Sequence, residues 1–257
     1  MKRYNYLQTI YLSFFSRDLY RDVAKNWGGG VVLYLFILLL ICWAVMIVRY
    51  QPVINHSFQH IANELAPQIP EIHIKKGEVS TPENRPYLIK DKESGETIII
   101  IDTSGKYPDL NETPSSTKVL ITHDKVYYVD DSNSERIQKI PAKITVEIKP
   151  DQVKQSLIKI ADWLWVIFLP ILLILSFAYR LVQALIYAVI GKIFSALSNA
   201  SLSYAELLKL SMVAVTPVIV ISTILDWFSV AFPFQWLLYF IITMAYLIFA
   251  IGANKTN

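Results

Sequence analysis

The sequence predicts a multi-pass α-helical membrane protein with an inserted extracytoplasmic α+β domain that is rich in short antiparallel strands. Two observations favour this class. Of the 257 residues, 54% are hydrophobic and only 18% are charged, whereas a soluble domain carries about 25% charged residues. The hydrophobic residues are concentrated in 31–50 and 158–253, and the intervening residues 51–157 are polar. This division indicates membrane helices on both sides of one water-exposed domain.

Residues 1–30 predict a cytoplasmic N-terminal segment built around an amphipathic helix over 3–26. Its basic side chains Arg17, Arg21 and Lys25 recur every four residues, and aromatic and aliphatic residues lie mostly on the opposite face. A basic segment beside a membrane helix is typical of the cytoplasmic face. The helix can lie among the lipid head groups or pack on the other helices of the bundle, and both alternatives stay open.

Residues 31–50 predict the first transmembrane helix because they contain no charge before Arg49. Twenty residues at about 1.5 Å per residue cross the hydrocarbon core of about 30 Å. No small-residue cleavage site follows, so we expect a retained anchor in the plasma (inner) membrane. The single cysteine, Cys42, lies in this run and excludes an intrachain disulfide.

Residues 51–157 predict the extracytoplasmic α+β domain. A helix is expected over 51–66, before Pro67, and a second helix over 151–163 feeds the next span. Ser94-Gly95 and Asp124-Lys125 are expected at hairpin turns. Short β-branched or aromatic runs predict strands within 71–79, 86–91, 96–103, 117–124, 125–131 and 143–149.

Residues 158–253 predict the C-terminal transmembrane bundle. Arg180 is expected to close its first span at the inner interface. Five spans in all are favoured because 181–199 is long and apolar enough to cross, although four remain open if this segment lies flat or re-enters. We expect kinks at Pro170 and Pro217. The predicted spans lie near 158–179, 181–199, 207–225 and 234–253.

Several stretches of the chain are similar to one known family. They are SFFSRDLYRDVAKNWGGG (13–30), LAPQIPEIHIKKGEVSTPENRPYLI (65–89), IIIIDTSG (98–105) and LPILLILSFAYRLVQALIYAVIGKIF (169–194). Together they resemble the bacterial integral membrane proteins of the domain of unknown function 1189. Residues 201–222 also resemble the later spans of Yip-type membrane proteins. The resemblance implies the order of helices and domain and a bacterial source, and it implies no particular reaction.

His56, His60 and Glu64 form the candidate metal site. They are four residues apart on a predicted helix, which places two imidazoles and a carboxylate on one face. The alternative is a solvated polar face without a ligand. Asp102-Thr103-Ser104-Gly105 mimics part of an aspartic protease motif, but such enzymes need a second carboxylate. A turn after a buried strand explains this segment equally well.

Lys192, Pro170 and Pro217 are the candidate functional residues of the membrane bundle. A charge in a membrane span indicates function by default, although the long stem of Lys192 can carry its ammonium group to the interface. The small residues Ala184, Ala188, Gly191, Ser195 and Asn199 add a stripe suited to close helix contact. Discontinuous helices of this kind occur in transporters.

The function favoured by the sequence is that of an accessory or binding protein whose extracytoplasmic domain contacts an envelope or membrane protein partner or ligand. Transport or lipid handling by the bundle is the alternative, and a hydrolase acting through Asp102 or through His56 and His60 is a third. We expect no catalytic activity and no cofactor. The lipid bilayer is the expected partner and a homo-oligomer is allowed. The net charge of +3 is too small to indicate a nucleic acid partner.

Overall fold

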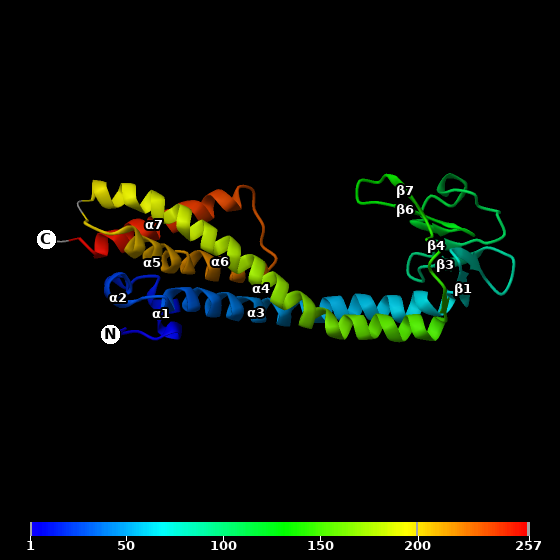
Figure 1. Ribbon diagram of the computed structural model, residues 1–257, viewed down its shortest axis with the longest axis horizontal. Coiled ribbons are helices and arrows are strands. Elements are labelled where there is room, and N and C mark those ends of the chain that lie inside the picture. The colour runs from blue at the N-terminus through cyan, green and yellow to red at the C-terminus, as the bar shows by residue number, and fades with distance from the viewer. Residues whose placement is uncertain (1, 199, 256–257) are drawn as a thin grey trace. The chain divides into compact units, whose positions relative to one another are not determined.

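The computed structural model describes residues 2–198 and 200–255, and the chain divides into two compact units. The helical unit comprises Met1–Gln51 and Trp165–Asn257, and the β unit comprises Pro52–Leu164. Two long helices, α3 (Gly30–His60) and α4 (Pro150–Leu197), contribute residues to both units (Figure 1). The predicted boundaries of the polar domain, 51 and 157, therefore lie inside continuous helices.

The described residues form four helices that are long and apolar enough to cross a membrane. They cover Gly30–Gln68, Pro150–Leu197, Tyr204–Trp227 and Gln235–Ala253. The third is divided into α5 (Tyr204–Ala214) and α6 (Thr216–Trp227), and the fourth is α7 (Gln235–Ala253). Pro217 stands in the first turn of α6, so the interruption predicted there is confirmed.

Five spans were expected, whereas the described residues form four helices of membrane-spanning length. The two spans predicted near 158–179 and 181–199 form one helix, α4, of 48 residues; the last residue of that range, 199, lies outside the described residues. At about 1.5 Å per residue, α4 is about 72 Å long. A continuous helix cannot reverse direction, so α4 counts as one candidate span. Pro170 lies inside α4 without ending it.

The N-terminal segment forms two helices, α1 (Tyr6–Leu12) and α2 (Arg17–Asn26), in place of the single helix predicted. Ser16 separates them because its hydroxyl caps α2 by accepting a hydrogen bond from the Leu19 N–H at 3.2 Å. Helix α2 contacts α5 and α7, and its side chains Leu19, Tyr20 and Val23 are buried. Packing on the bundle is thus the alternative that α2 adopts.

The β unit contains two sheets. One has the strand order β2-β1-β8 and the other β3-β4-β5-β6-β7. All pairs are antiparallel except β4 and β5, which are parallel. The strands are β1 (Ile72–Lys75), β2 (Glu78–Ser80), β3 (Tyr87–Lys90), β4 (Thr97–Ile101), β5 (Val119–Ile121), β6 (Lys125–Val129), β7 (Glu135–Lys139) and β8 (Val146–Ile148).

The four isoleucines at 98–101 explain the core of the β unit. Strand β4 lies between β3 and β5 and has apolar neighbours on both faces. Ile101 packs with Ile72 of the smaller sheet, whereas Ile100 packs with Leu120 and with Leu110 from the crossover. That crossover contains the short helix η3 (Leu110–Glu112) and supplies the connection that a parallel pair requires.

Candidate functional site: a polar groove beside Arg180

The predicted membrane residue Lys192 lies near the end of α4. Its Nζ atom donates a hydrogen bond to the Leu202 carbonyl at 3.0 Å. The ammonium group therefore binds a loop carbonyl immediately beyond the helix. Pro170 and Pro217, the other two candidates, carry no polar side chain. Ala184 and Ala188 from the predicted small-residue stripe are buried in the core, while Asn199 lies outside the described residues.

Arg180 is the charged residue farthest from the helix ends. At about 1.5 Å per residue, it lies about 25 Å along α4 from Leu197, where the helix ends. It lies about 22 Å from Trp165, the first residue of α4 that belongs to the helical unit. The sequence predicted Arg180 at the boundary between two spans, whereas the structure places it inside the continuous helix α4. The guanidinium Nη1 donates to Gln183 Oε1 at 2.7 Å, and Gln183 Nε2 donates to the Tyr187 hydroxyl at 2.9 Å.

No carboxylate lies within 4.0 Å of the Arg180 guanidinium among residues 2–198 and 200–255. Its neutral partner Gln183 accepts one hydrogen bond, while an arginine carries five N–H donors in a planar fork. The remaining N–H donors of Arg180 have no acidic side chain of the described residues close enough to form an ion pair. The site therefore has positive charge and unused hydrogen-bond donors.

Arg180 lines a cavity of about 350 Å³ formed by α3, α4 and α6. Ser176 and Trp43 join two of these helices, because the indole Nε1 of Trp43 donates to Ser176 Oγ at 2.9 Å. The hydroxyl groups of Ser222 and Thr223 donate to the Ile219 carbonyl at 3.0 and 2.8 Å. These hydroxyl protons are committed to the helix backbone. Among the described residues that line the groove, Arg180 is the only cation.

One end of the helical unit lies where α6 ends. Arg49 of α3 donates from Nε to the Trp227 carbonyl at 3.0 Å, which places a cation at the negative end of α6. Asp226 also lies here, is exposed, and lines the same cavity as Arg180. The groove is therefore lined by both a half-buried arginine and an acidic residue near this end.

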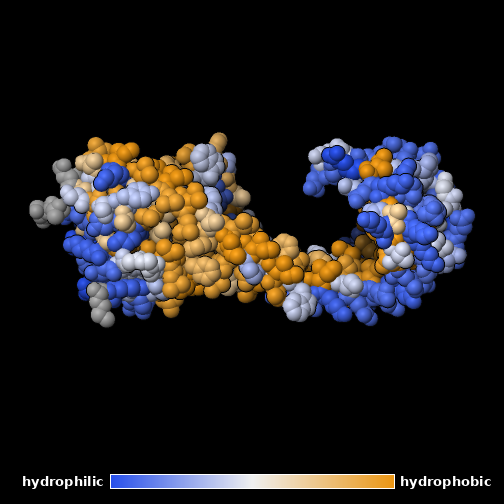
Figure 2. Space-filling view, in the orientation of Figure 1, coloured by the Kyte–Doolittle hydropathy of each residue, from blue (hydrophilic) through white to orange (hydrophobic). Residues whose placement is uncertain are grey.

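The opposite end of the helical unit carries the two chain termini (Figure 1). Arg21 Nε donates to the Ala253 carbonyl at the end of α7 at 2.7 Å, and Lys209 Nζ donates to the Ala24 carbonyl near the end of α2. These basic groups satisfy helix-terminal carbonyls and oppose the helix dipoles. Figure 2 shows hydrophilic residues gathered at this end and hydrophobic residues over the adjoining helices.

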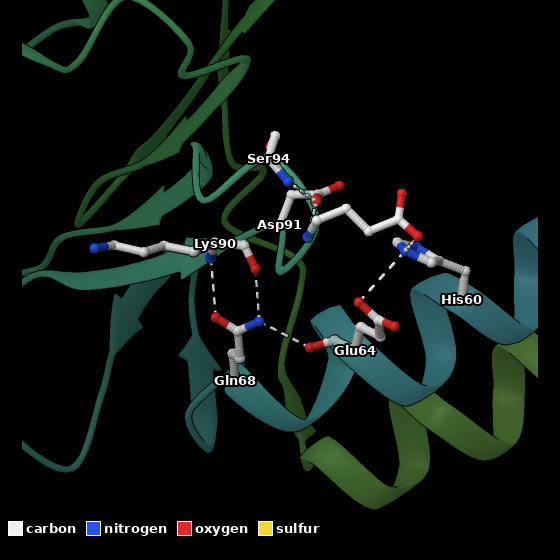
Figure 3. Close-up of polar contacts among 7 residues, drawn as sticks. His60, Glu64, Gln68, Lys90, Asp91 and Ser94 are labelled. Carbon is white, nitrogen blue, oxygen red and sulfur yellow. Dashed lines mark hydrogen bonds and ion pairs between the residues drawn. The ribbon is translucent and has the colours of Figure 1, made fainter.

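The predicted metal ligands do not come together as a group of three. His60 ends α3, and a π-helical turn, Ile61–Leu65, follows it. The His60 Nε2 atom lies 3.3 Å from Glu64 Oε2 and 3.9 Å from Glu93 Oε1 (Figure 3). His56 makes no such contact. The part of the chain that the structure describes contains no group of three His, Cys, Asp or Glu side chains that could hold a metal ion.

Gln68 joins this helix end to strand β3 (Figure 3). Its Nε2 donates to the Lys90 carbonyl at 2.7 Å, and its Oε1 accepts from the Lys90 N–H at 2.9 Å. The side-chain amide thus pairs with the strand backbone as a neighbouring strand would. His60 and Glu64 lie on the same helical segment, so the contact of His60 with Glu93 belongs to this junction.

Asp102 stabilises the turn that follows β4. Its Oδ1 accepts from the Ser104 N–H at 2.8 Å and from the Ser104 hydroxyl at 2.6 Å, and its Oδ2 accepts from the Tyr107 N–H at 2.6 Å. The residue is 1% exposed. Burial opposes ionisation, but these hydrogen bonds prevail and lower the pKa of the carboxyl group. Both oxygens are occupied, which favours the turn interpretation over catalysis.

We expect Asp102→Asn to destabilise the β unit by about 2 kcal/mol, because an amide nitrogen would face the Tyr107 N–H. The stabilisation by the wild-type carboxylate is fully present above its ordinary pKa of about 3.9 and is lost as the pH falls through the lowered value. Hydrogen exchange of residues 97–107 in the full chain, measured at pH 7 and towards pH 3, checks both statements. The exposed Asp131→Asn is the control, and equal protection in the two variants would contradict the assignment.

The described residues form four helices of membrane-spanning length and a separate unit of two β-sheets. The chain is therefore of the class that combines long apolar helices with a separate β-sheet unit. Within that class, the chain belongs to the family described as protein of unknown function (DUF1189), which matches residues 7–251. The family resemblance found in the sequence is thereby confirmed. No curated protein and no solved structure matches the chain.

Proposed function

We propose that the chain is a non-enzymatic binding protein of the bacterial plasma membrane. The helical unit lies in the bilayer, both termini face the cytoplasm, and the β unit faces the outside. The observation that carries this orientation is the gathering of basic side chains, including Arg21 and Lys209, where α2 and the end of α7 meet. Cytoplasmic ends of membrane helices carry such an excess of Lys and Arg. Four crossings return the chain to the side on which it began.

The β unit is the binding module in this proposal. Its larger sheet ends at β7, whose five residues are all exposed. Ile137, at the centre of β7, is 62% exposed. An edge strand has unpaired backbone groups that can bind an extended segment of a partner, and an exposed apolar side chain adds a contact. We place the contact with an envelope protein at this edge.

Site-specific photocrosslinking in intact cells tests this function. A photoreactive residue at Ile137 is expected to give a discrete adduct with an envelope protein, whereas the same residue at the exposed Glu83 is expected to give none. Ser94→Cys in a Cys42→Ser background reports the placement of the β unit and should react with an impermeant maleimide from outside. Equal adducts at both positions, or none, would contradict the binding role.

A second candidate function, lipid handling or transport, is favoured by the groove of the helical unit. Its lining includes the polar side chains of Ser176, Ser222 and Thr223, and Arg180 lies in it far from either end of α4. An ionisable residue within a membrane bundle faces a polar cavity and marks a ligand or ion pathway. Arg180 takes the place that the sequence suggested for Lys192.

A further inference from the structure

We propose that the groove beside Arg180 binds the phosphate group of a phospholipid. The inference rests on the proposed placement of the helical unit in the bilayer and names a ligand class for that unit. Its first support is the charge of Arg180, which no carboxylate of the described residues approaches within 4.0 Å. A guanidinium surrounded by apolar helices needs an anionic partner to offset its loss of hydration.

The donor geometry favours phosphate. Gln183 accepts from one terminal nitrogen, Nη1, at 2.7 Å, so the Nε and Nη2 donors remain for a ligand. Arginine binds phosphate oxygens through two parallel N–H donors, which a lysine ammonium cannot reproduce. The nearby hydroxyls of Ser222 and Thr223 already donate to a backbone carbonyl. Among the described residues that line this groove, Arg180 alone carries the positive charge that an anion would pair with.

The composition of the groove favours a lipid as the source of that phosphate. Leu39, Met46 and Ile219 line the same cavity as Arg180 and give it an apolar wall for glycerol and acyl carbons. The cavity volume of about 350 Å³ is large enough for a phospholipid head group. The exposed carboxylate of Asp226 also lines it. An ammonium-bearing head group such as phosphoethanolamine complements both charges, with phosphate at Arg180 and ammonium at Asp226.

The test uses the full-length chain in detergent, titrated with short-chain phosphatidylethanolamine. Bound lipid is counted by native mass spectrometry. We expect Arg180→Gln to weaken binding at least about tenfold. Arg180→Lys keeps the charge without the fork and should bind with intermediate affinity. Ser222→Leu should block the groove while leaving Arg180 in place.

Arg17→Gln is the matched control, because Arg17 is exposed on α2 and its loss should leave lipid binding unchanged. Inorganic phosphate is titrated in parallel. If phosphate at millimolar concentration displaces the lipid completely, or if Arg180→Gln and Ser222→Leu bind lipid like the parent chain, the proposal is overturned. Maleimide labelling of Ser94→Cys in each variant separates this outcome from an incorrect orientation of the β unit.

Discussion

Replacing Gly77 by valine is expected to destabilise the β unit by about 3 kcal/mol or more. Gly77 follows Lys76 in the two-residue turn between β1 and β2. The φ angle is +84° at Gly77 and +52° at Lys76. A Cβ atom on Gly77 would lie 2.7 Å from the Ile140 carbonyl oxygen and 3.1 Å from the Ala142 Cα atom. Because both contacts are with backbone, no side-chain rotation relieves them, and the left-handed conformation adds strain for a β-branched residue.

Gly95→Val is the control for this prediction. Gly95 also has a positive φ of +72°, but nothing lies within 4 Å of its Cβ position. It should therefore cost only the strain of the backbone conformation, about 1–2 kcal/mol. Hydrogen exchange of residues 72–80 and 97–101 in the full chain measures both variants. If the two substitutions increase exchange equally, the contact with Ile140 does not limit the fold.

The sequence predicts strands well where side chains alternate or are uniformly apolar. The isoleucines at 98–101 were expected in a buried strand, and β4 has apolar neighbours on both faces. Strand β7 was missed because its residues, Glu135–Lys139, are all exposed and lack an apolar face. Residues 71–79 were expected as one strand because Ile72 and Ile74 alternate. The turn at Lys76-Gly77 divides them, since the glycine permits a positive φ.

Helix boundaries were harder to predict where a charge or a proline interrupts an apolar run. Arg180 was expected at an interface, but its contact with Gln183 on the next turn keeps the guanidinium within the helical unit. The groove itself could not be predicted, because it joins α3, α4 and α6. Trp43 and Ser176, which contact each other, are 133 positions apart in the chain. Local periodicity contains no information on such a pair.

The second large effect is expected at the N-terminal segment, where Asp22→Ala should destabilise the attachment of residues 2–27 by about 2–4 kcal/mol. The Asp22 carboxylate accepts hydrogen bonds from the Arg3 N–H at 3.0 Å, Asn26 Nδ2 at 2.7 Å and Trp27 Nε1 at 2.9 Å. Burial opposes its ionisation, but these donors together lower the pKa of the carboxyl group. Alanine removes all three interactions and leaves the Trp27 indole N–H buried, since Trp27 is 3% exposed.

Trypsin cleavage at Arg21 and Lys25 in inside-out vesicles measures this attachment, because proteolysis follows the population of the opened segment. Asp18→Ala is the matched control. Asp18 pairs with Arg21 at 3.1 Å, but its side chain is 62% exposed, and an exposed ion pair contributes less than about 1 kcal/mol. We expect rapid cleavage of the Asp22 variant and parental rates for the Asp18 variant. Equal rates would mean that α2 is attached mainly by Leu19, Tyr20 and Val23, whose burial both substitutions leave unchanged.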